Sequence, residues 1–199
     1  LPQGDTGRIG IAISPSHPHL VYAIIQHNDG GVFRTENRGE TWVKRGSLPY
    51  PLMFSVYFCK MRVDPQNPDK VWDLGYGLSL SLDGGKTYTS EGTWENIHTD
   101  HHALWINPNN PDHILLGGDG GLYISYSGSR TWDFIDNLPI SQFYGIGIDT
   151  RDPYWIYGGA QDHGAFGLPS RTDSRLGITN SDMVLVAFGD AYHCVVDPK

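Results

Sequence analysis

The stretch ALWINPNNPDHILLGG at residues 103–118 decides the fold, because the chain repeats it. It consists of a β-run, a turn bracketed by prolines and a second β-run. Versions of it recur as IGIAISPSHPHLVYAII at residues 9–25, CKMRVDPQNPDKVWDL at residues 59–74 and, more loosely, GIGIDTRDPYWIYGGA at residues 145–160. The second proline of each turn gives spacings of 50, 43 and 42 residues, at Pro18, Pro68, Pro111 and Pro153. A repeat of this length predicts an array of similar structural units.

A second motif, S/T-x-D-x-G-x-T-W/Y, follows each of the first three proline turns. Its best copy is SLDGGKTY at residues 81–88, and degenerate copies are TENRGETW at residues 35–42 and SYSGSRTW at residues 125–132. The threonines of the three copies, Thr41, Thr87 and Thr131, are 46 and 44 residues apart. Because two different motifs recur in phase, the repeat does not depend on either of them alone.

Each repeat is expected to contain four strands. In the first repeat these are residues 8–14, 20–26, 32–35 and 41–45, with a tight hairpin at Asn28-Asp29-Gly30-Gly31. No stretch shows a 3.6-residue apolar period over ten positions, which excludes helical repeats. Four strands in a repeat of about 40–50 residues are typical of propeller blades. The sequence therefore predicts an all-β protein, a β-propeller of four-stranded antiparallel blades.

The blades are expected at about residues 8–46, 54–92, 98–138 and 142–188, and residues 190–199 read as the start of a fifth. Residues 1–199 would thus form a single partial β-propeller, an open arc of a larger ring. The two end blades of an arc expose apolar faces, so we expect the remaining blades or other subunits to cover them.

The composition excludes several classes of protein. The chain has 199 residues, of which 39% are hydrophobic and 18% charged, as in a folded domain. A formal net charge of −8 argues against a nucleic-acid partner. No apolar run reaches the roughly 18–20 residues of a membrane helix, so membrane insertion is not expected. Cys59 and Cys194 lack metal-binding spacing and are interpreted as buried free thiols.

These repeats resemble the BNR or Asp-box superfamily, which includes sialidases, xyloglucanase-type hydrolases and sortilin. The sequence is most similar to bacterial sortilin-like proteins that are often labelled glycosyl hydrolases, through HTDHHALWINPNNPDHILLGGDGGLYIS at residues 98–125 and AQDHGAFGLPSRTDSRLGITNSD at residues 160–182. The resemblance covers essentially the whole chain and implies an extracellular or periplasmic location.

The sequence also departs from that superfamily. Asn37 and Ser127 stand where an Asp-box has aspartate, and residues 170–182 replace the fourth box. Neither the arginine cluster of sialidases nor their tyrosine–glutamate pair is recognisable, and no pair of carboxylates can be assigned as in xyloglucanases. Whether the protein is an enzyme is therefore left open.

The Asp-box residues are interpreted as structural. The carboxylate accepts hydrogen bonds from backbone N–H groups, the glycines permit the turn, and the aromatic residue packs in the core. The residues concerned are Asp83, Gly85, Thr87 and Tyr88 in the second repeat, Thr41 and Trp42 in the first, and Thr131 and Trp132 in the third.

Topology assigns the candidate ligand-binding residues to the opposite face. In a four-stranded meander, the connection between the second and third strands and the segment leading into the first strand lie at the same end. This axial face collects polar loops from successive blades, and Asp73 to Tyr76 are expected among them. The predicted ligand-binding residues are His98, Asp100, His102, Asp119, Asp162 and Asp190.

Two of these groups have alternative interpretations. In an extended chain His98, Asp100 and His102 point to one side, so they are candidates for a zinc or other divalent-metal site. The same residues could instead hydrogen-bond neighbouring turns. Asp119 and Asp100 are candidate catalytic carboxylates, although an aspartate flanked by glycines often satisfies only its own turn. No other cofactor is expected.

Three functions follow from these observations. The first is a secreted or periplasmic propeller that binds a glycan or peptide on its axial face. The alternative is a glycoside hydrolase of the xyloglucanase type, with catalytic carboxylates partly outside this chain. The third is a structural module of a multidomain surface protein. In the first two cases, clustered carboxylates should raise some of their own pKa values and those of adjacent histidines.

Overall fold

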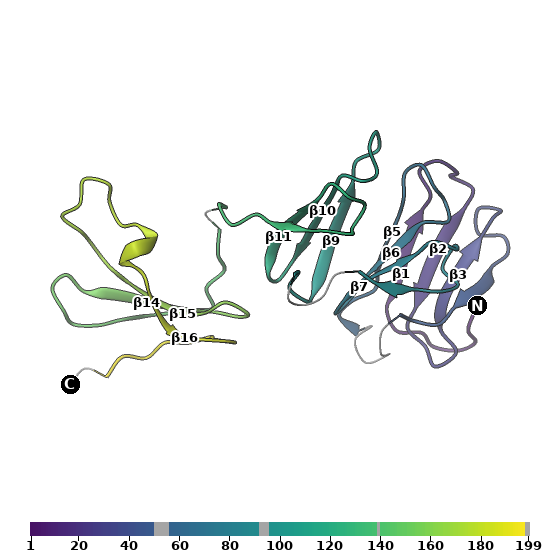
Figure 1. Cartoon of the computed structure of the whole chain (residues 1–199). Helices are drawn as coiled ribbons and strands as arrows, with labels where there is room; N and C mark the ends of the chain where they lie inside the picture. Colours follow the sequence, from purple (N-terminus) through teal and green to yellow (C-terminus); the bar gives the residue numbers. More distant parts are fainter. Residues whose placement is uncertain (50–55, 92–95, 139, 198–199) are drawn as a thin grey trace. The chain divides into compact units, whose positions relative to one another are not determined.

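The computed structural model describes residues 1–49, 56–91, 96–138 and 140–197, and it divides the chain into two compact units, Leu1–Asp136 and Asn137–Lys199. Within the described residues, strands form four antiparallel four-stranded sheets, three in the first unit and one in the second (Figure 1). This confirms the predicted all-β class and its four-stranded meanders.

In every sheet the strands are hydrogen-bonded in chain order. The first sheet contains β1 (Ile9–Ile13), β2 (Val21–Ile25), β3 (Gly31–Thr35) and β4 (Val43–Gly46). The second contains β5 (Lys60–Val63), β6 (Val71–Leu74), β7 (Leu78–Ser81) and β8 (Thr89–Ser90). The third contains β9 (His101–Ile106), β10 (Ile114–Gly118), β11 (Gly121–Ser125) and β12 (Asp133–Phe134). The fourth contains β13 (Gly145–Ile148), β14 (Trp155–Ala160), β15 (Gly164–Pro169) and β16 (Val184–Ala187).

The strands of the first sheet begin and end within two residues of those expected from the sequence. The hairpin between β2 and β3 shows why the sequence is informative there. Gly31 adopts φ 135°, and a Cβ at this position would lie 2.3 Å from the carbonyl oxygen of Gly46. Only glycine fits such a conformation and such a close approach, so the Gly30-Gly31 pair fixes the register of the hairpin.

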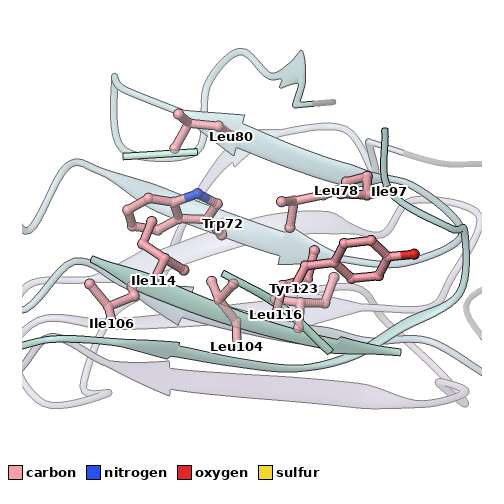
Figure 2. Close-up of a cluster of buried hydrophobic side chains, with 10 residues drawn as sticks. Trp72, Leu78, Leu80, Ile97, Leu104, Ile106, Ile114, Leu116 and Tyr123 are labelled. Carbon is pink, nitrogen blue, oxygen red and sulfur yellow. The ribbon is translucent and has the colours of Figure 1, made fainter. Parts of the chain in front are cut away.

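The core lies between neighbouring sheets, because the central strands are buried on both faces. Trp72, Leu78 and Leu80 of the second sheet pack against the third sheet (Figure 2). Met61 and Val71, on the opposite face of the second sheet, pack against the first sheet. The aromatic residues of the three turn motifs are partly buried at the margins of these clusters: Trp42, Tyr88 and Trp132.

Sheet β1–β4 presents an apolar row to solvent. Ile9, Ile11 and Ile13 alternate along β1 and are 48%, 64% and 59% exposed. A solvated row of three isoleucines is unfavourable. The expectation that remaining blades or other subunits cover it stays a prediction.

The described residues contain little helix. The segment η2 (Asn180–Asp182) is a short 3-10 turn within the long insertion of the fourth sheet. No helix among the described ranges has the length and apolar character needed to cross a membrane. Cys59 is buried and Cys194 is half-buried, and neither forms a disulfide.

The turn between β7 and β8 is held by the carboxylate of Asp83. Its oxygens accept hydrogen bonds from the backbone N–H groups of Lys86 and Thr87 and from the hydroxyls of Ser81 and Thr87, at 2.7–3.1 Å. These bonds, those from Thr87 first, lower the pKa of Asp83 well below its usual value. In the equivalent turn of the first sheet, Asn37 accepts from the Thr41 N–H and donates to the Thr41 hydroxyl.

We expect Asp83→Ala to lower the free energy of unfolding by about 1–2 kcal/mol, because two backbone N–H groups lose their acceptor. Asp83→Asn is the matched control, since Asn37 forms the same kind of turn, and it should retain most of the stability. Urea unfolding of the three proteins measures the difference. Equal stability of Asp83→Ala and the unmodified chain would contradict the structural role.

Candidate functional site

Each sheet has two ends, and different connections between strands lie at each of them. The turn end carries the proline turns and the Asp83-type turns. The lead-in end carries the connection between the second and third strands and the segment leading into the first. In the third sheet the lead-in end contains residues 98–102, of which the last two open β9, and the Asp119-Gly120 turn between β10 and β11. Four of the six residues predicted from the sequence lie here.

His102 and Asp119 form the centre of this end. Nε2 of His102 lies 3.0 Å from Oδ1 of Asp119, and both side chains are a little under one-third exposed. The contact does not have the direction of a hydrogen bond, because Nε2 has no hydrogen-bond partner within the described part of the chain. The two side chains are therefore in close contact, and Nε2 of His102 is itself buried beneath the surface.

His98 and Asp100 are brought to the same turn. The backbone N–H of Asp119 donates to the carbonyl of Asp100 at 3.2 Å. A Cβ on Gly120 would lie 2.1 Å from the Cβ of His98, so the turn packs directly against this histidine. Asp100 has φ +66°, a left-handed conformation that costs energy in any residue other than glycine. Such conformations are concentrated at functional sites.

The second sheet supplies aromatic residues that the sequence analysis did not select. The ring of Phe58 is stacked on the imidazole of His102 at 5.5 Å, and Tyr57 meets the same imidazole edge-on at 5.1 Å. Nζ of Lys60 donates to the carbonyl of His102 at 3.0 Å. Their position in the repeat could have indicated them. Tyr57 and Phe58 directly precede β5, the first strand of the second sheet, just as His98 and Asp100 precede β9, the first strand of the third.

The connection between β6 and β7 completes this surface. Its carbonyls at Gly75 and Tyr76 accept hydrogen bonds from the backbone N–H groups of His101 and Asp100, at 3.0 and 3.1 Å. Tyr57 and Tyr76 are 57% and 50% exposed. The exposed Tyr57 therefore borders the histidine–carboxylate pair, and hydrogen bonds tie the connection that carries Tyr76 to the backbone of the same end.

No metal site forms from these residues. Among the residues that the structure describes, no three His, Cys, Asp or Glu side chains are placed to hold a metal ion. The extended geometry behind the metal hypothesis for His98, Asp100 and His102 is wrong. Asp100 is left-handed, and the pairing of β9 with β10 skips His102 in a β-bulge. Both features break the alternation that would point the three side chains to one side.

The remaining two candidates lie in the second unit and contact each other. The backbone N–H of Asp162 donates to Oδ1 of Asp190 at 3.2 Å, and Asp162, like Asp100, has φ +66°. Nearby, the hydroxyl of Tyr144 donates to the side chain of Gln161, and the rings of Tyr144 and Tyr192 meet edge-on. Desolvation and the charge of Asp190 raise the pKa of Tyr192. The lead-in end of the fourth sheet therefore also combines tyrosines with aspartates.

Burial is the first cause of two large pKa changes in the second and third sheets. Burial, together with the neighbouring His98 and His102, lowers the pKa of His101 to about 4, the opposite of the rise expected for histidines beside carboxylates. Burial raises the pKa of Asp73 well above its usual value. Asp73 was expected in a polar loop, but it lies in β6 with its side chain fully buried.

The surface at the lead-in end suits recognition of a polar, ring-shaped ligand. Exposed tyrosines offer flat apolar faces, and a histidine–aspartate pair offers hydrogen-bond acceptors and a donor. Among the candidate catalytic residues, Asp119 is paired with His102, and Asp100 accepts a hydrogen bond from the Thr99 hydroxyl at 3.0 Å.

No family model matches the chain. A curated relative, a probable oligoxyloglucan-reducing end-specific xyloglucanase of Neosartorya fischeri, is 24% identical over 149 residues. The match covers 67% of this chain and 18% of the relative.

Two solved structures of β-propeller proteins have a similar fold. The GH74 xyloglucanase from Xanthomonas campestris matches with a TM-score of 0.53 and 16% identity, over 80% of this chain and 29% of its own. YCF48 from Cyanidioschyzon merolae matches with a TM-score of 0.51 and 14% identity, over 85% of this chain and 55% of its own. The chain therefore has the fold of propeller blades, and it spans less than a third of either xyloglucanase.

Proposed function

We propose that this chain is the glycan-binding part of an Asp-box β-propeller that acts outside the cytoplasm on a β-glucan of the xyloglucan type. The observation that carries the proposal is the lead-in end of the second and third sheets, where the exposed Tyr57 borders the His102–Asp119 pair. Sugar rings stack on aromatic faces, and their hydroxyls match carboxylate and imidazole groups.

Two further observations support a polysaccharide over a peptide. The curated relative and one of the similar structures carry the name xyloglucanase. The second unit repeats the combination of tyrosines and aspartates with Tyr144, Tyr192, Asp162 and Asp190. Recognition of a polymer with a repeated chemical unit would use such a combination more than once.

We expect Tyr57→Ala, His102→Ala and Asp119→Ala each to weaken binding of xyloglucan oligosaccharides by about tenfold or more, since each removes a central contact. Calorimetric titration with the oligosaccharides and with an unrelated peptide panel measures the affinities. Tyr126→Ala is the matched control, because Tyr126 is also exposed (65%) but follows β11 at the turn end.

Unchanged affinity in the three variants, together with a loss in Tyr126→Ala, would place binding at the turn end and contradict the proposal. Binding of a peptide instead of the oligosaccharides would contradict the ligand class.

A second candidate is hydrolysis of xyloglucan, which the name of the curated relative favours. A glycosidase needs two carboxyl groups about 5–10 Å apart, one of them protonated. Asp119 and Asp100 would supply one of the two, and a partner would come from elsewhere in the protein. Release of new reducing ends, abolished by Asp119→Asn or Asp100→Asn, would distinguish an enzyme from a binding module.

A further inference from the structure

Three side chains of the second sheet donate hydrogen bonds to backbone carbonyls of the third sheet. In each case the acceptor follows the donor by 42 residues. The pairs are Nζ of Lys60 with His102 at 3.0 Å, Nε of Arg62 with Leu104 at 3.1 Å, and Nε2 of Gln66 with Pro108 at 2.9 Å. The constant offset means that the two chain segments run side by side in one register, and these side chains bridge them.

Two of the three bridges reach β9 beside the bulge at His102. Among the described strands only β10 pairs with β9, so one edge of β9 has no strand partner. The bulge also leaves His102 itself without a pairing partner on β10. The bond from Lys60 therefore holds the backbone at the point where the ladder of the third sheet does not. Because the donor is charged, this bond is stronger than one between neutral groups.

The seam between the first and second sheets is built in a different way. Gly10 occupies the position in the first repeat that corresponds to Lys60 in the second, given the spacing of 50 residues between Pro18 and Pro68. A Cβ on Gly10 would lie 2.1 Å from the carbonyl oxygen of Cys59, so β1 and β5 meet backbone to backbone. Neighbouring sheets of this chain thus pack without a cationic bridge. The bridge belongs to the seam that carries the contacts of His102.

Lys60 and Phe58 hold His102 by two different parts. Phe58 stacks on the imidazole at 5.5 Å, and Lys60 binds the carbonyl of the same residue at 3.0 Å. One residue separates Phe58 from Lys60, so a single short segment fixes both the ring and the backbone of His102. Asp119 contacts the ring from its own sheet. Without the bond from Lys60, the start of β9 could shift and carry the imidazole off the face of Phe58.

We propose that Lys60 and Arg62 are positioning residues of the lead-in end. Through the carbonyls of His102 and Leu104 they hold the start of β9 in the register that stacks the imidazole on Phe58 and beside Tyr57. Neither cation has to touch a ligand for this role. The effect on glycan affinity rests on the function proposed above, whereas the effect on the imidazole does not.

The first test follows the imidazole of His102 by NMR in the full chain without ligand. A ring stacked on an aromatic face has shielded protons, and His102→Ala identifies the signal by its disappearance. Lys60→Met keeps an unbranched side chain but removes the charged donor, so the His102 signals should move downfield. Lys60→Arg restores a charged donor and should return them most of the way. Thermal melts establish that each variant folds.

Gln66→Met is the matched control, because it removes a bridge of the same seam at the turn end, away from His102. It should leave the His102 signals in place. Arg62→Met is a second test variant and should move them in the same direction as Lys60→Met, by a smaller amount. Unchanged signals in both Lys60→Met and Arg62→Met, or an equal movement in Gln66→Met, would overturn the proposal.

The second test measures the affinity for xyloglucan oligosaccharides by calorimetry. Lys60→Met should weaken binding by about fivefold, less than His102→Ala, and Lys60→Arg should bind nearly as the unmodified chain does. A Lys60→Met variant that moves the His102 signals but binds with full affinity would show that the position of the imidazole does not matter for the glycan, against the proposal. If the unmodified chain binds no oligosaccharide, the proposed function fails, and the NMR result alone decides whether Lys60 and Arg62 hold the ring.

Discussion

Replacement of Asp73 by asparagine is expected to stabilise the chain at neutral pH and to remove a pH dependence of its stability. The Asp73 carboxyl is fully buried, and its oxygens have no hydrogen-bond partner within the described residues. Burial raises its pKa well above the usual value of an aspartate. Asparagine has nearly the same shape and never ionises. It therefore occupies the site without the free-energy cost of burying a group that is charged in the unfolded chain.

Proton linkage determines how the stability of the chain changes with pH. Between pH 4 and the raised pKa, the folded chain keeps the Asp73 proton while the unfolded chain releases it. The folded state then binds more protons, so stability falls as pH rises, by at most about 1.4 kcal/mol per pH unit. Below the unfolded pKa the two proteins should be equally stable. The difference between their free energies of unfolding should grow from pH 4 up to the pKa of Asp73 in the folded chain and stay constant above it.

Urea unfolding of both proteins at intervals between pH 4 and pH 9 measures this difference. Asp64→Asn is the matched control, because Asp64 is also buried but accepts hydrogen bonds from the N–H groups of Gln66 and Asn67 and lies 3.5 Å from Nζ of Lys70. This variant should lose stability at neutral pH. An Asp73→Asn variant less stable than the unmodified chain at pH 8 would mean that the carboxylate is ionised and well paired.

The sequence predicted the sheets well because the signals for them are local. The alternation along β1 and the Gly30-Gly31 hairpin act within a few residues, and they place the strands of the first sheet within two positions. The gathering of His98, Asp100, His102 and Asp119 followed from meander topology, which fixes the end of the sheet at which each connection lies.

The details of the site depended on contacts between sheets, which local patterns do not encode. The stacking of Phe58 on His102 joins residues that lie far apart in the sequence. The left-handed Asp100 and the bulge at His102 arise because residues 100 and 101 also bind the turn of the second sheet. Asp73 was misplaced for a related reason. An aspartate beside Gly75 is typical of a loop, but packing of the first sheet buries it.

The second large effect is expected for Trp72→Ala. Trp72 is fully buried in the cluster between the second and third sheets, together with Ile114 and Leu116 (Figure 2). Its removal leaves a large cavity, which should lower the free energy of unfolding by about 3–5 kcal/mol. Trp105→Ala is the matched control, since Trp105 is 47% exposed on β9 and should cost much less.

This substitution also links the core to the proposed site. The imidazole of His102 is held on one side by Asp119 of its own sheet and on the other by Phe58 of the second sheet. The smaller side chain should loosen the packing between the second and third sheets. This would move Phe58 away from His102 and Asp119, while all three residues stay the same. Glycan affinity of the folded Trp72→Ala variant should therefore fall, whereas Trp105→Ala should bind normally. If Trp72→Ala loses stability but binds as tightly as the unmodified chain, the third sheet alone holds the ligand, and the role of Tyr57 and Phe58 is contradicted.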